Sequence, residues 1–335
     1  MKKMITISMT IDELTACNGK ITLDLSQLLS QAQTQQKTPE TTVSFCHFME
    51  QTISTMDGNR KPRTIETYRT TLNSLRRFLD GNDIGIGDIS ASTLDAYEQW
   101  LQSKGIKQNS TSFYMRKLRA VYRRAVREEL TPDRHPFENV YTGMARTVKR
   151  AVDITVIRQL AAMNITDRKS AFARDMFMFS FFTQGMAFID MAYLKATNIK
   201  NGTLTYQRQK TGQTINIKWI QPMQQIVDRY AKAATSYLLP IIGKGRGTER
   251  SKFRACQCAV NNNLKELSAQ LGLQQHITMY VARHSWASIA RSINIPIDII
   301  SQGMGHHNES TTHIYLKEID TGRMAEANQR VINLL

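Results

Sequence analysis

The chain has 335 residues, of which 44 are basic and 28 acidic, and its formal net charge is +16. This length predicts two domains with substantial cores, and the charge favours a polyanionic partner, for which nucleic acid is preferred over an anionic membrane surface. Apolar runs are too short to cross a bilayer, no signal peptide follows Met1, and four cysteines do not make a disulfide framework, so we expect a cytoplasmic protein.

Residues 1–39 form a separate N-terminal piece. Apolar residues alternate with polar ones at 5–11 and again at 21–25, which is typical of strands, and a glutamine-rich run precedes Pro39. We interpret this piece as either a short arm or a loosely ordered leader, because the pattern favours neither.

Residues 40–133 contain four helical patterns separated by turn signals. In the clearest of them, which follows Pro62, the apolar positions recur at helical spacing: Ile65, Tyr68, Leu72, Leu75 and Leu79. Another begins near Ser92. These patterns predict a helical domain, which a basic linker at 134–152 joins to the rest of the chain.

The last of the four helical patterns has an apolar stripe and a basic face. The basic side chains are Arg116, Lys117, Arg119, Arg123, Arg124 and Arg127. Such a run is most often a solvated helix surface, but no acidic residue interrupts this one. We therefore predict that this face contacts the phosphates of DNA while the apolar stripe packs on the domain.

Residues 153–335 mix helical and strand patterns, which predicts a mainly α domain with a small antiparallel β-sheet. The run at 176–182 is apolar almost all round and predicts a buried core helix. Alternation at 204–206 and 215–219 predicts a hairpin with Lys210 at its exposed tip. Further helices are expected at 222–236, at 251–271, around Arg283, after Pro296 and at 321–334.

Arg283, His306 and Tyr315 are spaced by 23 and 9 residues near the end of this domain. They suit attack on a phosphodiester, because tyrosine, with a usual pKa of about 10, is a weak nucleophile that needs cations beside it. Arg283 and His306 can donate hydrogen bonds to the non-bridging oxygens of the phosphate. Taken singly, each residue type is more often structural than catalytic. The chemistry requires no metal and no other cofactor, and no carboxylate cluster for a metal is apparent.

The three residues lie in the segments Tyr280-Val-Ala-Arg-His284, Gly303-Met-Gly-His306 and Ser310-Thr-Thr-His-Ile-Tyr315. These segments resemble the C-terminal signature of the tyrosine recombinases, the phage-integrase family: histidine-x-x-arginine-histidine, leucine-glycine-histidine and threonine-x-x-tyrosine. The resemblance covers about residues 40–335. It implies a two-domain DNA breaking-rejoining enzyme fold, in which a helical SAM-like core-binding domain precedes an α+β catalytic domain at 153–335.

The resemblance also implies an activity: a bacterial mobile-element integrase that cleaves and rejoins duplex DNA through a 3'-phosphotyrosyl bond to Tyr315. Lys210 would protonate the departing 5' oxygen, and His284 would support the site. Such enzymes act as homo-tetramers on two DNA sites, with host or element-encoded DNA-bending proteins as accessory factors. Many carry an N-terminal module for accessory DNA sites, of which residues 1–39 would be a short version. Integration, excision and inversion all stay open.

Two positions depart from the family pattern. Tyr280 stands where the family has histidine, and its hydroxyl can still hydrogen-bond a phosphate. Gln184 stands where the family has its first arginine, and its neutral amide keeps hydrogen-bond donors but lacks the charge. Either another cation replaces that charge, with Arg174 or Arg168 just upstream as the nearest candidates, or the protein is a catalytically impaired DNA-binding protein. A DNA-relaxing enzyme with the same chemistry is a third, less favoured interpretation, because it needs no assembly on specific sites.

Overall fold

The computed structural model describes residues 43–56, 58, 60–145, 150–233, 235–306 and 309–313, together with 329, 332 and 333. The chain divides into two compact units at residues 146 and 147. The predictions for residues 1–39, for Tyr315 and for most of the helix at 321–334 lie outside the described residues. In the described part of the chain, no helix combines the length and the apolar character needed to cross a membrane.

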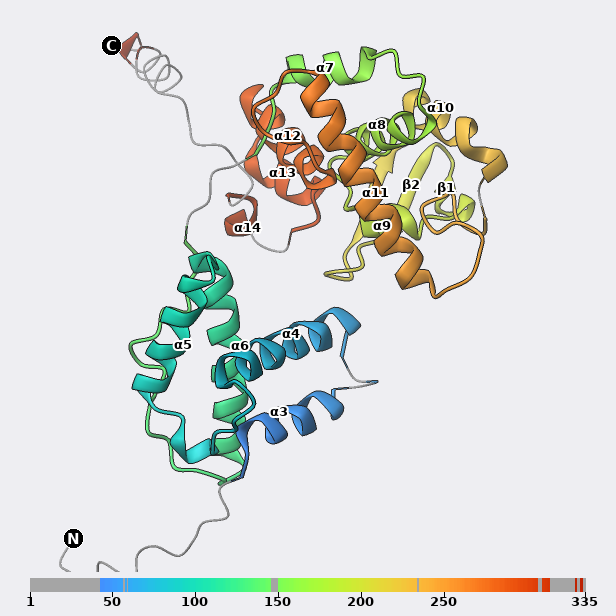
Figure 1. Ribbon diagram of the computed structural model, residues 1–335. Coiled ribbons are helices and arrows are strands. Elements are labelled where there is room, and N and C mark those ends of the chain that lie inside the picture. The colour runs from blue at the N-terminus through green and yellow to red at the C-terminus, as the bar shows by residue number, and fades with distance from the viewer. Residues whose placement is uncertain are drawn as a thin grey trace, which may run out of the picture. The chain divides into compact units, whose positions relative to one another are not determined.

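The described residues of the first unit form four helices, as the four helical patterns predict (Figure 1). They are α3 (Phe45–Ser54), α4 (Pro62–Leu79), α5 (Ala91–Ser103) and α6 (Gln108–Arg127), with a 3₁₀ turn η1 (Ile86–Asp88) before α5. Local signals set the helix starts. Pro62 occupies the first turn of α4, where its missing N–H costs no hydrogen bond, and the Ser90 hydroxyl accepts from the Thr93 backbone N–H at the start of α5.

The core of the first unit lies around α6, which contacts α3, α4 and α5. The apolar stripe of α6 is buried, including Met115, Leu118 and Val121. Tyr97 of α5 is fully buried as well, and its hydroxyl donates to Ser74 Oγ at 2.7 Å, which satisfies the polar atom that the ring brings into the core. The apolar half of the predicted two-faced helix is therefore confirmed.

The described part of the second unit contains eight helices and one three-stranded sheet. The helices are α7 (Ile154–Ala162), α8 (Arg168–Phe182), α9 (Phe188–Ala192), α10 (Gln221–Tyr230), α11 (Glu249–Gln270), α12 (Met279–Ser292), α13 (Ile297–Gly303) and α14 (Glu309–His313). The strands are β1 (Ile199–Lys200), β2 (Thr203–Gln207) and β3 (Thr214–Lys218), and the 3₁₀ turns are η2 (Ala196–Asn198) and η3 (Ala231–Ala233). The helix expected at 222–236 is shorter than predicted and ends in η3.

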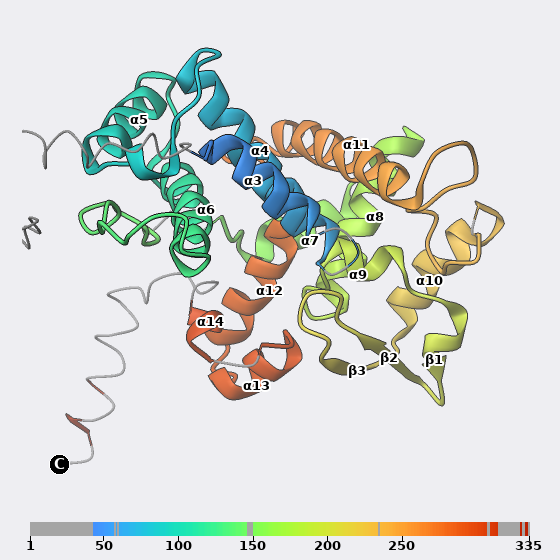
Figure 2. The ribbon, with the colours of Figure 1, turned by 90° about the horizontal axis from the view of Figure 1, so that it is seen from below.

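Helix α8 is the centre of the second unit's core. Met176, Phe177 and Phe179 are fully buried, and the helix contacts α7, α10, α11 and α12. In Figure 2 it lies between α11 and the sheet. Because neighbours cover it on several sides, its central residues are apolar all round, and the prediction of a buried core helix at 176–182 is confirmed.

The sheet is antiparallel, with the strand order β1-β2-β3. In the predicted hairpin Leu204 pairs with Ile217 and Tyr206 with Ile215, and these four side chains are buried while those between them are exposed. Residues 208–213 form the turn that joins β2 to β3. Strand β1 was not predicted, since two residues are too few to show alternation.

Candidate active site

Arg283 lies in the second turn of α12, and its side chain is buried, with 3% of the residue exposed. Nη1 donates to the Gly185 carbonyl at 2.7 Å, while Nη2 donates to the Met304 carbonyl and lies 3.0 Å from His306 Nε2. These contacts connect α12 with the turn after α8 and with the end of α13. The rigid fork of the guanidinium is therefore held in one orientation by groups from separate segments.

His306 follows the left-handed residue Gly305 (φ 65°) and is buried. Its Nδ1 lies 2.8 Å from the hydroxyl of Thr312 on α14, and its Nε2 lies 3.0 Å from Arg283 Nη2. A guanidinium only donates hydrogen bonds, so Nε2 must be the acceptor. The proton of the neutral ring is therefore on Nδ1, which donates to Thr312.

Burial, and after it the positive charges of Arg283, Arg208 and Lys210, together lower the pKa of His306 to about 4. The ring is therefore neutral at pH 7 in the free protein. Three cations acting on one imidazole also mean that the fold gathers positive charge here. Of the predicted catalytic residues, Lys210, Arg283 and His306 are brought together, and Arg208 joins them.

The low pKa of His306 predicts how stability changes with pH. An unfolded histidine has a pKa near 6.5, so between pH 6.5 and 4 the unfolded chain binds a proton that the folded protein does not. Stability is therefore lost as the pH falls through this window. We expect wild type to lose about 2 kcal/mol more than His306→Gln between pH 7 and pH 5, because the variant has no ring to titrate.

Urea unfolding at the two pH values measures this difference. A Trp100→Phe background leaves Trp219 and Trp286 as the tryptophans of the chain, and both report on the second unit. The carboxylates titrate alike in both proteins and cancel in the comparison. Equal losses of unfolding free energy in wild type and His306→Gln would contradict the lowered pKa.

Lys210 is exposed in the turn 208–213, as the hairpin pattern predicts. The base of this turn is held by hydrogen bonds. The buried Asp190 carboxylate of α9 accepts from the Gln209 backbone N–H at 2.8 Å, and the Gly212 N–H donates to the Arg208 carbonyl at 2.7 Å. The backbone on both sides of Lys210 is thus fixed, while its long side chain extends from an exposed position.

Sequence reasoning missed three residues of this site: Arg208, Asp190 and Thr312. For Arg208 a signal was present, because the alternation of buried Leu204 and Tyr206 along β2 continues to position 208 and directs a charged side chain inward. Asp190 is likewise a carboxylate within an otherwise apolar helix. No local signal identified Thr312 as the partner of the histidine ring.

The turn after α8 brings Gln184 beside the Arg283 site. Gly185 is left-handed (φ 74°), and a Cβ added to it would lie 2.7 Å from Arg283 Cα, so only glycine permits this approach. Gln184 is half-buried and also left-handed, with φ 59°. Its Oε1 would lie 3.0 Å from a Cβ added to Gly303. Gln184 thus lies in the turn that contacts Arg283, and its neutral amide faces Gly303 where the resemblance expects a cation.

The structure does not bring Arg168 or Arg174 to this site. Arg174 Nε pairs with Asp175 at 3.0 Å, and its Nη1 donates to the Met163 carbonyl at 2.9 Å. Arg168 begins α8, 14 residues before Phe182, and is thus about 21 Å from the end of the helix. These positions do not favour either arginine as a replacement for the missing charge, because Arg168 lies at the far end of the helix and Arg174 is engaged by Asp175 and Met163.

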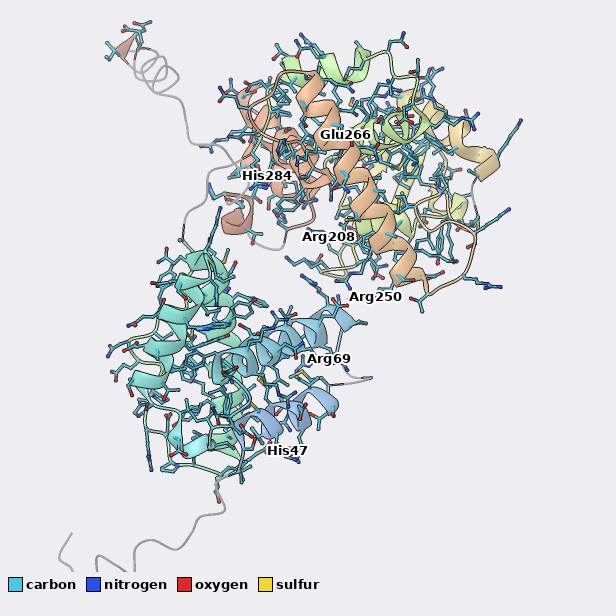
Figure 3. All side chains as sticks on the ribbon, in the orientation of Figure 1. His47, Arg69, Arg208, Arg250, Glu266 and His284 are labelled. Atoms are coloured by element: carbon cyan, nitrogen blue, oxygen red, sulfur yellow. The ribbon has the colours of Figure 1, made fainter. Side chains whose placement is uncertain are left out.

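Tyr280 lies one turn before Arg283 on α12, and 56% of it is exposed. Its ring meets the ring of buried His284 edge-on, with the centroids 4.7 Å apart, and Figure 3 labels His284. His284 thus supports the orientation of Tyr280. The predicted nucleophile Tyr315 lies outside the described residues, so its place in the site stays a prediction.

The basic face of α6 is partly engaged inside the first unit. Arg124 Nε pairs with Glu128 at 2.7 Å, and Lys117 Nζ lies 4.6 Å from the centre of the Tyr68 ring. No acidic residue interrupts the basic run itself, but Glu128, which directly follows it, reaches back one helical turn to Arg124. The remaining basic residues are half-buried or exposed: Arg116, Arg119, Arg123 and Arg127.

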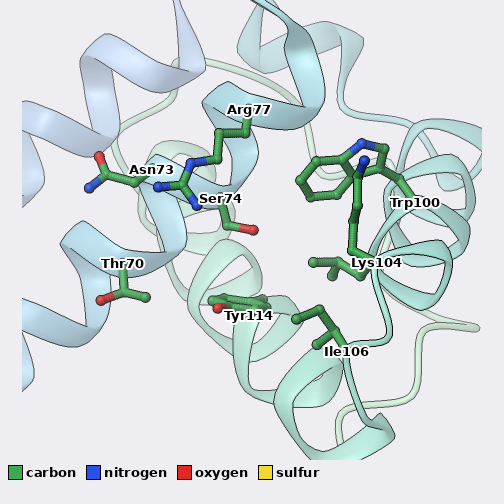
Figure 4. A pocket seen from close by; sticks show the side chains of 9 residues that line it. Thr70, Asn73, Ser74, Arg77, Trp100, Lys104, Ile106 and Tyr114 are labelled. Carbon is green, nitrogen blue, oxygen red and sulfur yellow. The ribbon is translucent and has the colours of Figure 1, made fainter.

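A hollow of about 450 Å³ lies between α4, α5 and α6 of the first unit (Figure 4). Arg77, Trp100, Lys104 and Tyr114 are among the residues that line it, and Lys104 Nζ is 5.9 Å from the centre of the Trp100 ring. None of the predicted catalytic residues lines this hollow. We assign it no role in catalysis.

Comparison with known proteins agrees with this division of the chain. Residues 44–141 match the phage integrase SAM-like domain, and residues 153–321 match the phage integrase family. Among curated proteins, the chain is similar to tyrosine recombinase XerC of Chromohalobacter salexigens. The two are 25% identical over 293 residues, which cover 83% of this chain and 93% of XerC.

Solved structures share the fold. The Tn1549 transposon integrase in complex with a circular intermediate DNA has a TM-score of 0.64 at 13% identity, over 86% of this chain and 99% of that one. A lambda integrase tetramer bound to a Holliday junction has a TM-score of 0.62 at 16% identity, over 90% and 87%. The predicted fold, a helical SAM-like domain followed by an α+β catalytic domain, is confirmed. Since the second family match alone spans half of the chain, the protein belongs to the phage integrase family of tyrosine recombinases, site-specific enzymes that cleave and rejoin DNA.

Proposed function

We propose that this protein cuts and rejoins duplex DNA at specific sites through a 3'-phosphotyrosyl bond to Tyr315. The observation that carries the proposal is the buried contact of Arg283 with His306, at 3.0 Å, within the field of Lys210 and Arg208. Positive charge gathered in this way suits a phosphodiester, because negative charge builds up on the phosphate oxygens in the transition state.

In the proposed reaction, the Tyr315 oxygen forms a bond to phosphorus while the bond from phosphorus to the 5' oxygen breaks. The tyrosine hydroxyl gives its proton to water, and Lys210 gives a proton to the departing 5' oxygen. A 3'-phosphate joined to tyrosine and a free 5' hydroxyl remain. Attack by an incoming 5' hydroxyl reverses the step, so the energy of the phosphodiester is conserved and no external energy source is needed.

Arg283 and His306 would stabilise the phosphorane in this step. His306 is neutral in the free protein, and its Nε2 accepts from Arg283. An anionic phosphate beside the ring raises the pKa of the imidazole, because it favours the charged form. The protonated ring then donates from Nε2 to a non-bridging oxygen. Tyr280, exposed one turn away on α12, would add its hydroxyl as a further donor.

For DNA binding we propose the basic face of α6. Arg116, Arg119, Arg123 and Arg127 are the primary contacts, and Lys117 and Arg124 join them where the phosphate backbone competes with their internal partners. The match of this unit to the phage integrase SAM-like domain supports the assignment. Binding through phosphates would weaken steeply with added salt, because each contact releases counterions.

We further propose that the protein acts as a homo-tetramer on two DNA sites of a mobile element, aided by a DNA-bending protein. The lambda integrase of the same fold forms a tetramer on a Holliday junction, and the Tn1549 transposon integrase is bound to a circular intermediate DNA. These likenesses support the assembly and the kind of element. They favour integration or excision through a circle over inversion.

One observation favours a second candidate, a DNA-binding protein that no longer cleaves. Gln184 provides a neutral amide in the turn that contacts Arg283, and losing one charged contact to a transition state typically costs about 100-fold in rate. On this alternative the basic face of α6 would still hold DNA.

The test is to place the gene with its native flanking DNA in a host that lacks the element, and to amplify across circle, integration and inversion junctions. The proposed function predicts new junctions, and their type names the reaction. Shuffling the flanking sequences while keeping the coding region intact is the control, and it should remove the junctions. Tight binding to the flanks without any junction would favour the DNA-binding alternative.

A further inference from the structure

Arg208 is a buried cation that sequence reasoning did not place in the site. It follows β2, and only 6% of it is exposed. Its Nη1 donates to the Gly305 carbonyl at 2.5 Å, while its Nε is buried and has no hydrogen-bond partner among the described residues. The ion pairs of the described residues do not include Arg208. Figure 3 labels this side chain.

A buried guanidinium without an ion pair lowers the stability of the folded protein. A buried charge without a counterion costs several kcal/mol, and a buried donor without an acceptor adds to that cost. Two more unpaired buried oxygens lie in the same turn, Thr211 Oγ1 and Gln213 Oε1. Unsatisfied buried groups in a native fold call for an explanation, and a bound ligand is one. The unpaired donor of Arg208 and the exposed Lys210 two residues on indicate an anion, because both groups carry positive charge.

The position of Arg208 relates it directly to Arg283. The two arginines hold consecutive carbonyls: Arg283 donates to Met304 and Arg208 to Gly305. The next residue, His306, contacts Arg283, and its pKa is lowered by both arginine charges. A Cβ added to Gly305 would lie 3.2 Å from Arg208 Cδ, so the arginine stem packs against this glycine. Two guanidinium groups thus flank the segment that carries the histidine.

We propose that Arg208 is the second arginine of the active site and contacts the scissile phosphate, supplying the charge that Gln184 lacks. This inference rests on the proposed function and names one more catalytic residue for it. A phosphorane carries more negative charge than the bound phosphodiester, so a second cation held in place before the reaction stabilises the transition state more than the substrate. Because Arg208 comes from the hairpin, the charge would reach the phosphate from a different element than the turn after α8.

The test compares two versions of one DNA substrate, a nicked duplex bearing the native site that traps the covalent protein–DNA adduct. In one version the scissile phosphate is normal, and in the other a methylphosphonate replaces it and removes its charge. Arg208→Ala should form the adduct about 100-fold more slowly on the phosphate, and at close to the wild-type rate on the methylphosphonate. The ratio of the two rates separates a charge contact from a structural role.

Arg229→Ala is the matched control. Arg229 is another arginine of the second unit and pairs with Asp175, away from Arg283 and His306. Its loss should leave the ratio of the two rates unchanged. If Arg208→Ala does not fold, Arg208→Gln, which keeps an amide donor near the Gly305 carbonyl, should give the same shift in ratio.

Equal losses on both substrates would overturn the inference, because Arg208 would then only hold the Gly305 carbonyl. An unchanged rate in Arg208→Ala would overturn it as well, while leaving the proposed function intact. No adduct from wild type on either substrate would instead overturn the proposed function, and the catalytic role of Arg208 with it.

Discussion

Replacing Tyr315 by phenylalanine is expected to abolish the covalent adduct while leaving DNA affinity unchanged. The change removes one oxygen, the atom that would bond to phosphorus, and no neighbouring group in this chemistry substitutes for it. Loss of a nucleophile typically lowers the rate on the order of 10⁴-fold or more. The measurement is adduct formation on a nicked native site, run beside a binding titration with the same DNA.

Tyr141→Phe is the control for this experiment, because it removes the same hydroxyl from an exposed tyrosine of the first unit. It should cleave and bind like wild type. A Tyr315→Phe protein that still forms an adduct would show that another residue is the nucleophile, and mass spectrometry of the trapped peptide would identify it.

Replacing Arg283 should have the second largest effect, because it removes a transition-state contact and structural contacts together. Arg283→Ala is expected to lower the rate of adduct formation about 1,000-fold. It also leaves the buried Gly185 and Met304 carbonyls without this donor, so the free energy of unfolding should fall by about 3 kcal/mol or more. Adduct formation and urea unfolding measure the two effects separately.

Arg283→Lys separates charge from geometry. Lysine keeps the positive charge but lacks the planar fork that reaches Gly185, Met304 and His306 at once, so we expect a loss of about 100-fold in rate. Arg229→Ala again serves as the control, since losing its ion pair with Asp175 should lower stability without changing the rate per folded molecule. A rate for Arg283→Ala that matches this control would exclude Arg283 from catalysis.

Tyr280 and Gln184 depart from the family pattern, and the structure bears on each of them differently. Tyr280 keeps a donor near Arg283 and is exposed, so a substrate can reach it. Gln184 lies in the turn that contacts Arg283 but carries no charge, and we propose that Arg208, next to the hairpin tip that carries Lys210, supplies that charge. If so, the activity depends on the hairpin more than the motif spacing alone indicates.

Much of the fold was predictable because the signals are local. The four helices of the first unit, the core helix at 176–182 and the hairpin around Lys210 follow from apolar periodicity, prolines and turn residues, each of which acts within a few positions. The helix expected at 222–236 ends earlier than predicted, because the residues near its end favour neither a helix nor a loop clearly.

The residues of the site could be predicted only where their spacing along the sequence forms a motif. Arg283 and His306 were found by their spacing, and Lys210 by its place in the hairpin together with the family resemblance. In the structure Arg283 contacts His306, and the charge of Lys210 acts on the His306 ring. The structure does not favour compensation by Arg174, because its side chain pairs with Asp175, and motif spacing does not reveal such a pair.

By itself, the sequence determined the helical patterns, the two-domain order and the set of residues suited to a phosphodiester. Only the tertiary structure decided that Arg208 is a buried cation, that His306 is neutral with its proton on Nδ1, and that Gln184 lies beside Arg283. The reason is distance along the chain. Arg208 meets Gly305 across 97 positions and Arg283 meets Gly185 across 98, so burial, charge and protonation at this site depend on contacts that no local pattern contains.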